Sequence, residues 1–139
     1  MNPVPKPRKR KKKPHSVMPK RQTSIRKRNP KRQRSEFARA YGSKERVEWI
    51  QGLPCVACLQ SPCDNAHIES GGKGRKADAD KIVPLCSDRV GDEGCHTELH
   101  RVGRYTFERI YRIDLKQEAS EVESLWQSYT LSHTGSEKK

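Results

Sequence analysis

The chain has 139 residues, enough for one small domain and too few for two. Only 31% of the residues are hydrophobic, and the formal net charge is +13. The apolar core must be small, so we expect part of the chain to be disordered and the rest to need a metal ion for stability. The sequence contains no apolar run near the ~18 residues that cross a membrane and no signal-peptide core after Met1. It therefore predicts a cytoplasmic protein without a membrane partner.

The positive charge is concentrated at the N-terminus. Residues 1–34 hold 15 of the 30 Lys and Arg residues and no acidic residue, which leaves 15 basic and 17 acidic residues in the rest of the chain. Such a run cannot pack into a core, so we expect residues 1–34 to form a disordered basic arm. We interpret the arm as a segment that neutralises phosphates and binds nucleic acid without sequence preference. A solubilising tail and, in a eukaryotic cell, a nuclear-localisation signal are the alternatives.

The next segment predicts two helices, a turn and a strand. The first helix is expected from about residue 35 to residue 42, and the second over residues 44–51 with Ser43 as its N-cap. A tight turn follows over residues 55–58. Residues 64–68 then have the pattern of a short strand.

The second half of the chain predicts the partner strand and a helical end. Residues 71–76 form a glycine-rich, cationic loop, and residues 82–85 are expected to be the second strand of a hairpin. A helix is expected over residues 96–102, with further helical sequence after it. The chain beyond residue 131 is expected to fray. A closing amphipathic helix is indicated by apolar residues at spacings of four, three, three and four: Leu115, Ala119, Val122, Leu125 and Tyr129.

The five cysteines indicate metal binding, because disulfides are rare in a reducing compartment. A Cys-x2-Cys pair presents two thiolates with suitable spacing, and structural zinc prefers four such ligands. We expect a structural Zn²⁺ on Cys55, Cys58, Cys86 and Cys95, with Cys63 as a free thiol. In the alternatives the cysteines are buried free thiols, or either Cys63 or His96 takes the place of Cys95.

The order of these motifs resembles that of the HNH endonucleases, which have a ββα-metal fold. The resemblance covers residues 43–112 and is nearest to phage-encoded members of the recombination-enhancement nuclease type. It implies an α+β fold with a small zinc-stabilised ββα-metal core, flanking helices and a nuclease domain over residues 35–131. The segments that carry it are Cys55-Val56-Ala57-Cys58, Ala66-His67-Ile68, the glycine-rich loop, Val83-Pro84-Leu85-Cys86 and Cys95-His96 followed by His100 and Gly103.

The resemblance also implies roles for three histidines. His67 corresponds to the general base that activates water, and His96 and His100 correspond to ligands of a catalytic divalent cation, which would be Mg²⁺, Mn²⁺, Ni²⁺ or Zn²⁺. Independently of the family, His96 and His100 are four residues apart, so they share one helix face and can hold one cation together. A neutral histidine suits proton abstraction near pH 7.

Two positions depart from the family pattern. Many members have Asp or His directly before the base, where this chain has Ala66. The middle Asn of the family name falls near Lys81, and either Asp78 or Asp80 is a hypothetical replacement for it. Acidic residues that are expected near the site and could help to hold the cation are Asp64, Glu69 and Glu98.

The sequence as a whole favours a metal-dependent DNA endonuclease, acting as a monomer in a bacterial host cell. A recombinase or another phage or host protein is an expected partner. The alternatives are a non-catalytic zinc-stabilised module that binds nucleic acid and a structural partner in a phage complex. Contacts to the DNA backbone, without base reading, are expected from Lys73, Arg75, Lys76, Arg101 and Arg104.

Overall fold

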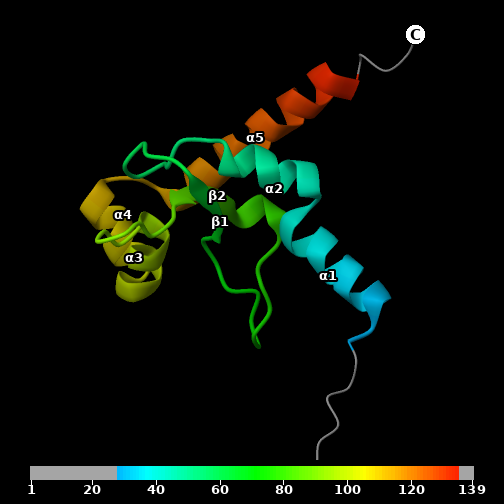
Figure 1. Cartoon of the computed structure of the whole chain (residues 1–139), viewed down its shortest axis with the longest axis horizontal. Helices are drawn as coiled ribbons and strands as arrows, with labels where there is room; N and C mark the ends of the chain where they lie inside the picture. Colours follow the sequence, from blue (N-terminus) through cyan, green and yellow to red (C-terminus); the bar gives the residue numbers. More distant parts are fainter. Residues whose placement is uncertain (1–27, 135–139) are drawn as a thin grey trace, which may run out of the picture.

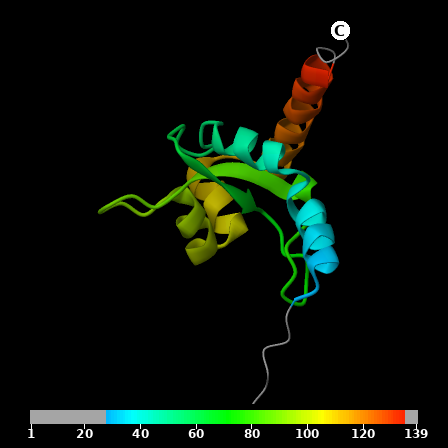
Figure 2. The same ribbon diagram turned by 45° about the vertical axis from the view of Figure 1, so that its right-hand side comes forward.

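The computed structural model describes residues 28–134. This part forms an α+β fold, as expected, with a two-stranded hairpin between helices (Figure 1). In Figure 2, α2 lies above the hairpin, and α3 and α4 lie below it. The elements in chain order are α1 (Pro30–Tyr41), α2 (Lys44–Gln51), β1 (Cys63–His67), the 3-10 helix η1 (Ala79–Lys81), β2 (Ile82–Cys86), α3 (Cys95–Val102), α4 (Arg104–Tyr111) and α5 (Leu115–Thr134).

The first helix begins earlier than expected. Asn29 caps α1 by accepting a hydrogen bond from the backbone N–H of Lys31 at 3.0 Å, and Pro30 occupies the first helical position. Both residues are favourable helix-start signals, so the predicted boundary of the disordered arm at residue 34 is wrong. Residues 1–27, where the rest of that prediction falls, lie outside the described part.

The second helix is confirmed together with its cap. The Ser43 hydroxyl accepts a hydrogen bond from the Arg46 backbone N–H at 3.1 Å. The side chain of Arg46 is buried, and it donates to the Ala79 carbonyl at 2.8 Å and pairs with Glu123 at 2.7 Å. One guanidinium therefore ties α2 to η1 and α5.

The hairpin is antiparallel, with Cys63 opposite Cys86 and His67 opposite Ile82. β1 begins one residue earlier than expected and ends at His67, although the Ile68 N–H still bonds to the Lys81 carbonyl at 3.0 Å. Every residue of β2 is buried, because α5, α3 and α2 all contact it. The neighbouring helices are therefore positioned against this buried strand.

The closing helix follows its predicted apolar pattern only in its first half. Leu115, Ala119 and Val122 are buried, whereas Leu125 is 55% exposed and Tyr129 is 38% exposed. The Tyr129 ring is partly covered because it packs against Trp49 of α2, with the ring centres 5.8 Å apart, whereas Leu125 is left on the exposed side of the helix. The end of α5 extends past the hairpin (Figure 1). The chain was expected to fray from residue 132, but α5 continues to Thr134, so this prediction is wrong for residues 132–134.

Among the described helices, none has both the length and the apolar composition that a membrane span requires.

Candidate metal centre and adjoining pocket

Four of the five cysteines meet at one end of the hairpin. Cys55 and Cys58 lie in the turn before β1, Cys86 ends β2, and Cys95 begins α3. Their sulfur atoms all lie within 4.8 Å of one another, and the Cys58 and Cys86 sulfurs are 3.5 Å apart. The sequence thus correctly predicted which four cysteines come together.

The geometry of this cluster fits a single metal ion. Four thiolates bound tetrahedrally at ~2.3 Å from zinc stand about 3.8 Å apart, which agrees with the observed spacing. Burial opposes ionisation of Cys55, but hydrogen bonds from the backbones of Cys58, Cys86 and Ala57 outweigh it and lower its pKa. Burial raises the pKa of Cys95, and the neighbouring sulfurs of Cys86 and Cys58 raise it further. A bound cation removes this repulsion, so the cluster could hold a metal ion.

A glycine closes the long loop between Cys86 and Cys95. Residues 87–94 form the loop between the last two cysteines, and Asp88 accepts a hydrogen bond from the Gly94 N–H at 2.7 Å. A Cβ at Gly94 would lie 2.4 Å from the backbone carbon of Ser87. The close approach that only glycine permits therefore brings Cys95 back to Cys86, although eight residues separate them in the sequence.

Cys63 stays outside the cluster, as expected for the spare thiol. It is buried, and its S–H donates to the Gln60 carbonyl at 3.3 Å. Burial, together with the charges of the neighbouring cysteines, raises the pKa of Cys63 to about 12. Cys63 is therefore a neutral thiol at physiological pH.

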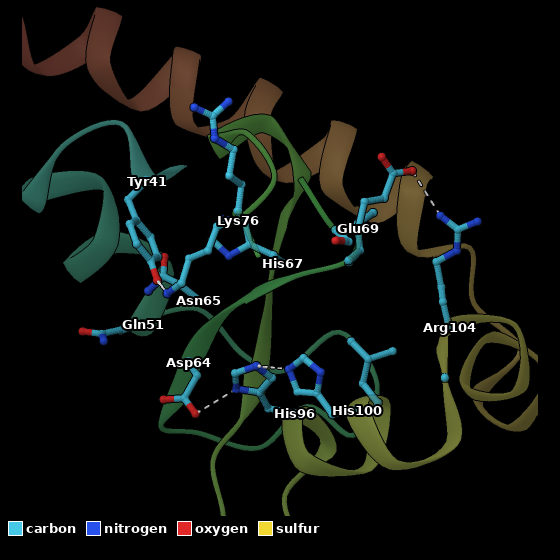
Figure 3. Close-up of a pocket in the computed structure, with 15 residues that line it drawn as sticks. Tyr41, Gln51, Asp64, Asn65, His67, Glu69, Lys76, His96, His100 and Arg104 are labelled. Carbon is cyan, nitrogen blue, oxygen red and sulfur yellow. Dashed lines mark hydrogen bonds and ion pairs between the residues drawn. The ribbon is translucent and has the colours of Figure 1, made fainter. Parts of the chain in front are cut away.

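Two histidines of α3 meet an aspartate of β1 beside the cluster (Figure 3). The Nε2 atoms of His96 and His100 are 3.2 Å apart, which confirms that the two rings share one helix face. The Nδ1 atom of His96 lies 3.1 Å from the Oδ2 atom of Asp64. Asp64 and His100 thus contact opposite nitrogens of the His96 ring.

His67 is half-buried at the end of β1. Its Nε2 atom lies 2.7 Å from the Ala40 carbonyl, one of the orphan carbonyls in the last turn of α1. Because a carbonyl can only accept, Nε2 carries the proton and Nδ1 keeps its lone pair in the neutral ring. Burial lowers the pKa of His67, and the positive charge of Lys76 lowers it further. The His67 ring is therefore neutral at pH 7, with a free lone pair on Nδ1.

These side chains line one pocket of about 730 Å³. Figure 3 shows His67 reaching it from the hairpin, the His96–His100 pair from α3, and Lys76 from the glycine-rich loop beside Tyr41. Lys76 bonds to the Tyr41 hydroxyl, and its ammonium lies 4.6 Å from the centre of that ring. The polar residues lining the pocket are Tyr41, Gln51, Asp64, Asn65, His67, Glu69, Ser70, Arg75, Lys76, His96, His100 and Arg104.

The structure separates the predicted phosphate-binding residues. Arg75, Lys76 and Arg104 line the pocket, but Arg104 is paired with Glu69 at 3.1 Å. Lys73 lines a neighbouring groove instead. Arg101 lines neither and pairs with Glu93 at 3.1 Å.

Three acidic residues named from the sequence lie outside the pocket. Asp78 and Asp80 were the hypothetical replacements for the middle Asn, and Glu98 was expected near the cation. Asp78 pairs with Arg39 at 2.9 Å, Asp80 pairs with Lys81 at 3.3 Å, and neither lines the pocket. Glu98 accepts a hydrogen bond from the Tyr111 hydroxyl at 2.5 Å, so it supports the α3–α4 packing.

Sequence reasoning did not anticipate two contacts of the site. The Ala40 carbonyl could not be foreseen, because a backbone atom gives no signal in the sequence. Asp64 was one of three candidate acids, and its place two residues from Ala66, on the same strand face, was the available signal.

Compared with known proteins, the chain matches no family model, no curated protein and no solved structure.

Proposed function

We propose that the protein is a metal-dependent endonuclease of the HNH type, with a structural zinc ion on its four clustered cysteines. The observation that carries the proposal is the facing pair of His96 and His100, which lines one pocket with the neutral base His67. The hairpin followed by α3 has the element order of a ββα-metal core. The substrate is DNA, and Arg75 and Lys76 supply positive charge for its phosphates.

The distance between the two facing nitrogens fits a shared cation. Two ring nitrogens bound to one ion at ~2.0–2.1 Å and at an angle of about 90–109° lie about 2.8–3.4 Å apart. The observed separation between His96 and His100 is 3.2 Å. Without a proton or a cation between them, two nitrogen lone pairs at this distance repel each other. The spacing therefore suits two ligands of one divalent ion, which would replace the proton of a hydrogen bond between the two rings.

Asp64 would act on a bound ion through its contact with His96. By accepting the Nδ1 proton at 3.1 Å, the carboxylate fixes the tautomer in which Nε2 of His96 is free to bind metal. Asp64 thus takes the place of the acid that the family often has at the position of Ala66. It does so from the same face of β1, two residues earlier.

The remaining groups suit hydrolysis of a phosphodiester. His67 uses Nδ1 to take a proton from the attacking water, while the Ala40 carbonyl holds its Nε2–H and orients the ring. Lys76 and Arg75 bind the phosphate oxygens on the loop side of the pocket. When bound, the divalent ion supplies charge stabilisation at the scissile phosphate.

The test is nicking of a supercoiled plasmid in Mg²⁺, Mn²⁺ or Ni²⁺. Removal of a general base costs about 10²- to 10⁴-fold in rate, so His67→Ala should lose at least a hundredfold. His133→Ala is the matched control, because His133 is exposed on α5, where its Nδ1 atom lies 2.8 Å from the Tyr129 carbonyl of the same helix. Each variant should retain one zinc ion per chain.

Two outcomes would decide against this assignment. Equal nicking by the wild type and His67→Ala would remove His67 as the base. If the zinc-loaded wild type binds DNA but cuts it with none of these ions, the protein is the non-catalytic nucleic-acid-binding module.

A further inference from the structure

A second groove, of about 780 Å³, lies between α1 and the glycine-rich loop. It adjoins the histidine pocket, because Tyr41, Arg75 and Lys76 line both. In Figure 2 the loop between β1 and β2 runs alongside α1, so the two walls come from segments far apart in the sequence. An extended ligand bound in this groove would therefore continue past Tyr41 towards His67.

The walls of the groove are strongly basic. They include one acidic residue, Glu36, whose carboxylate pairs with Arg32 at 2.8 Å. Arg39 is paired with Asp78 on the rim. After these two ion pairs the groove keeps a net positive charge, which suits a polyanion. The phosphates of a polyanion neutralise basic residues and release counterions. The basic residues that line the groove are Arg28, Arg32, Arg39, Lys73, Arg75 and Lys76.

The groove also carries aromatic side chains among its charges. Phe37 lines it and is 40% exposed, one helical turn before Tyr41, and the two ring centres are 5.2 Å apart. A large aromatic side chain exposed among arginines gains nothing from contact with a phosphate backbone. It does offer a flat face on which an unpaired base can stack. Duplex bases are already stacked on one another and cannot use that face.

We infer that the groove between α1 and the glycine-rich loop binds single-stranded nucleic acid and leads it to His67. Phosphates lie against the arginines and lysines, and a base stacks on Phe37. The volume of about 780 Å³ suits a short unpaired stretch rather than a double helix. This inference rests on the proposed function, which supplies the nuclease site that the strand reaches. It implies that the protein preferentially cuts unpaired stretches of its DNA substrate.

Binding can be tested separately from cleavage. The zinc-loaded full chain carrying His67→Ala, with no added divalent ion, is titrated into labelled oligo-dT longer than the ~4–16 nucleotides of typical single-strand sites. The comparison probe is a blunt duplex of the same length. The basic N-terminal residues raise the affinity for both probes, so the discriminating quantity is the ratio of the two affinities.

In this background, Phe37→Ala should weaken oligo-dT binding at least about fivefold and change duplex binding less than about twofold. Phe37→Trp should keep the affinity, because it keeps a flat ring. Tyr129→Ala is the matched control: Tyr129 is 38% exposed but lies on α5, outside the groove, and its loss should change neither affinity. A Phe37→Ala protein that binds oligo-dT within twofold of its parent, or that loses both probes alike, overturns the inference. If the protein does not nick the plasmid but binds oligo-dT and duplex with the expected ratio of affinities, the result contradicts the nuclease function and not the single-strand groove.

Discussion

Replacing one cysteine of the cluster should unfold the protein, whereas replacing the neighbouring spare cysteine should not. Cys55 is 0% exposed and belongs to the four-sulfur cluster, and Cys63 is 2% exposed and does not. Cys55→Ser and Cys63→Ser therefore make the same chemical change at the same depth. They differ only in whether the sulfur is placed to bind a metal ion.

The expected costs differ by several kcal/mol. Structural zinc contributes about 10–16 kcal/mol to the folding of small domains, which exceeds the ~5–15 kcal/mol net stability of a typical protein. Weakening the site at Cys55 should thus abolish the cooperative transition. Cys63→Ser should cost about 1 kcal/mol, because the serine hydroxyl can still donate to the Gln60 carbonyl. In a domain of about this size, that cost lowers Tm by roughly 4–8 °C.

The assay is thermal unfolding followed by circular dichroism, with zinc measured per chain in the same samples. Wild type and Cys63→Ser should hold one zinc ion and melt cooperatively, and a strong chelator should abolish both melts. Cys55→Ser should be zinc-free and show no transition. If Cys55→Ser melts at the same temperature as Cys63→Ser, the cluster is a group of buried thiols and not a metal centre.

Three further outcomes follow from the contacts. The nicking rate should fall as the pH drops through the lowered pKa of His67, because protonation removes the base. The midpoint should lie below pH 6.5, and a midpoint above pH 7 contradicts the effect assigned to burial. Asp64→Ala should weaken Mn²⁺ binding by about 10- to 100-fold in calorimetry without loss of zinc, since His96 loses its orienting carboxylate; unchanged affinity refutes that role. Glu123→Ala should cost about 2–3 kcal/mol in urea unfolding, because it leaves the buried Arg46 guanidinium unpaired; a cost under 0.5 kcal/mol would show that the pair contributes little.

Local chemical signals predicted much of this fold. Ser43 before an apolar helical pattern, and a Cys-x2-Cys pair before a short strand, depend only on nearby residues and were located correctly. The same holds for the i, i+4 placement of His96 and His100. Features of this kind are visible in a sequence because the interacting atoms are close along the chain.

The errors have two physical origins, a local signal that was outweighed by composition and a tertiary context that spacing does not show. The start of α1 was missed because the basic run over residues 31–34 has the composition of a disordered segment, although the Asn29 cap and Pro30 are helix-start signals close along the chain. Leu125 follows the apolar spacing of α5 but is exposed, while the next residue, Trp126, packs against Trp49 of α2. Spacing reports which residues share a helix face and cannot report which of them a neighbouring element covers.

The cysteine cluster and the histidine pocket are coupled through adjacent residues. Cys95 is followed by His96 on α3, and Cys86 faces Cys63, which is followed by Asp64 on β1. An ion held by the cysteines therefore fixes both ends of the His96–Asp64 contact, which spans 3.1 Å between the two elements. His67 is held differently, through the Ala40 carbonyl of α1. Loss of an ion from the cysteines should thus disturb the His96–His100 pair first. Activity measurements on cysteine variants would mix folding with chemistry, whereas substitutions at His67 separate them.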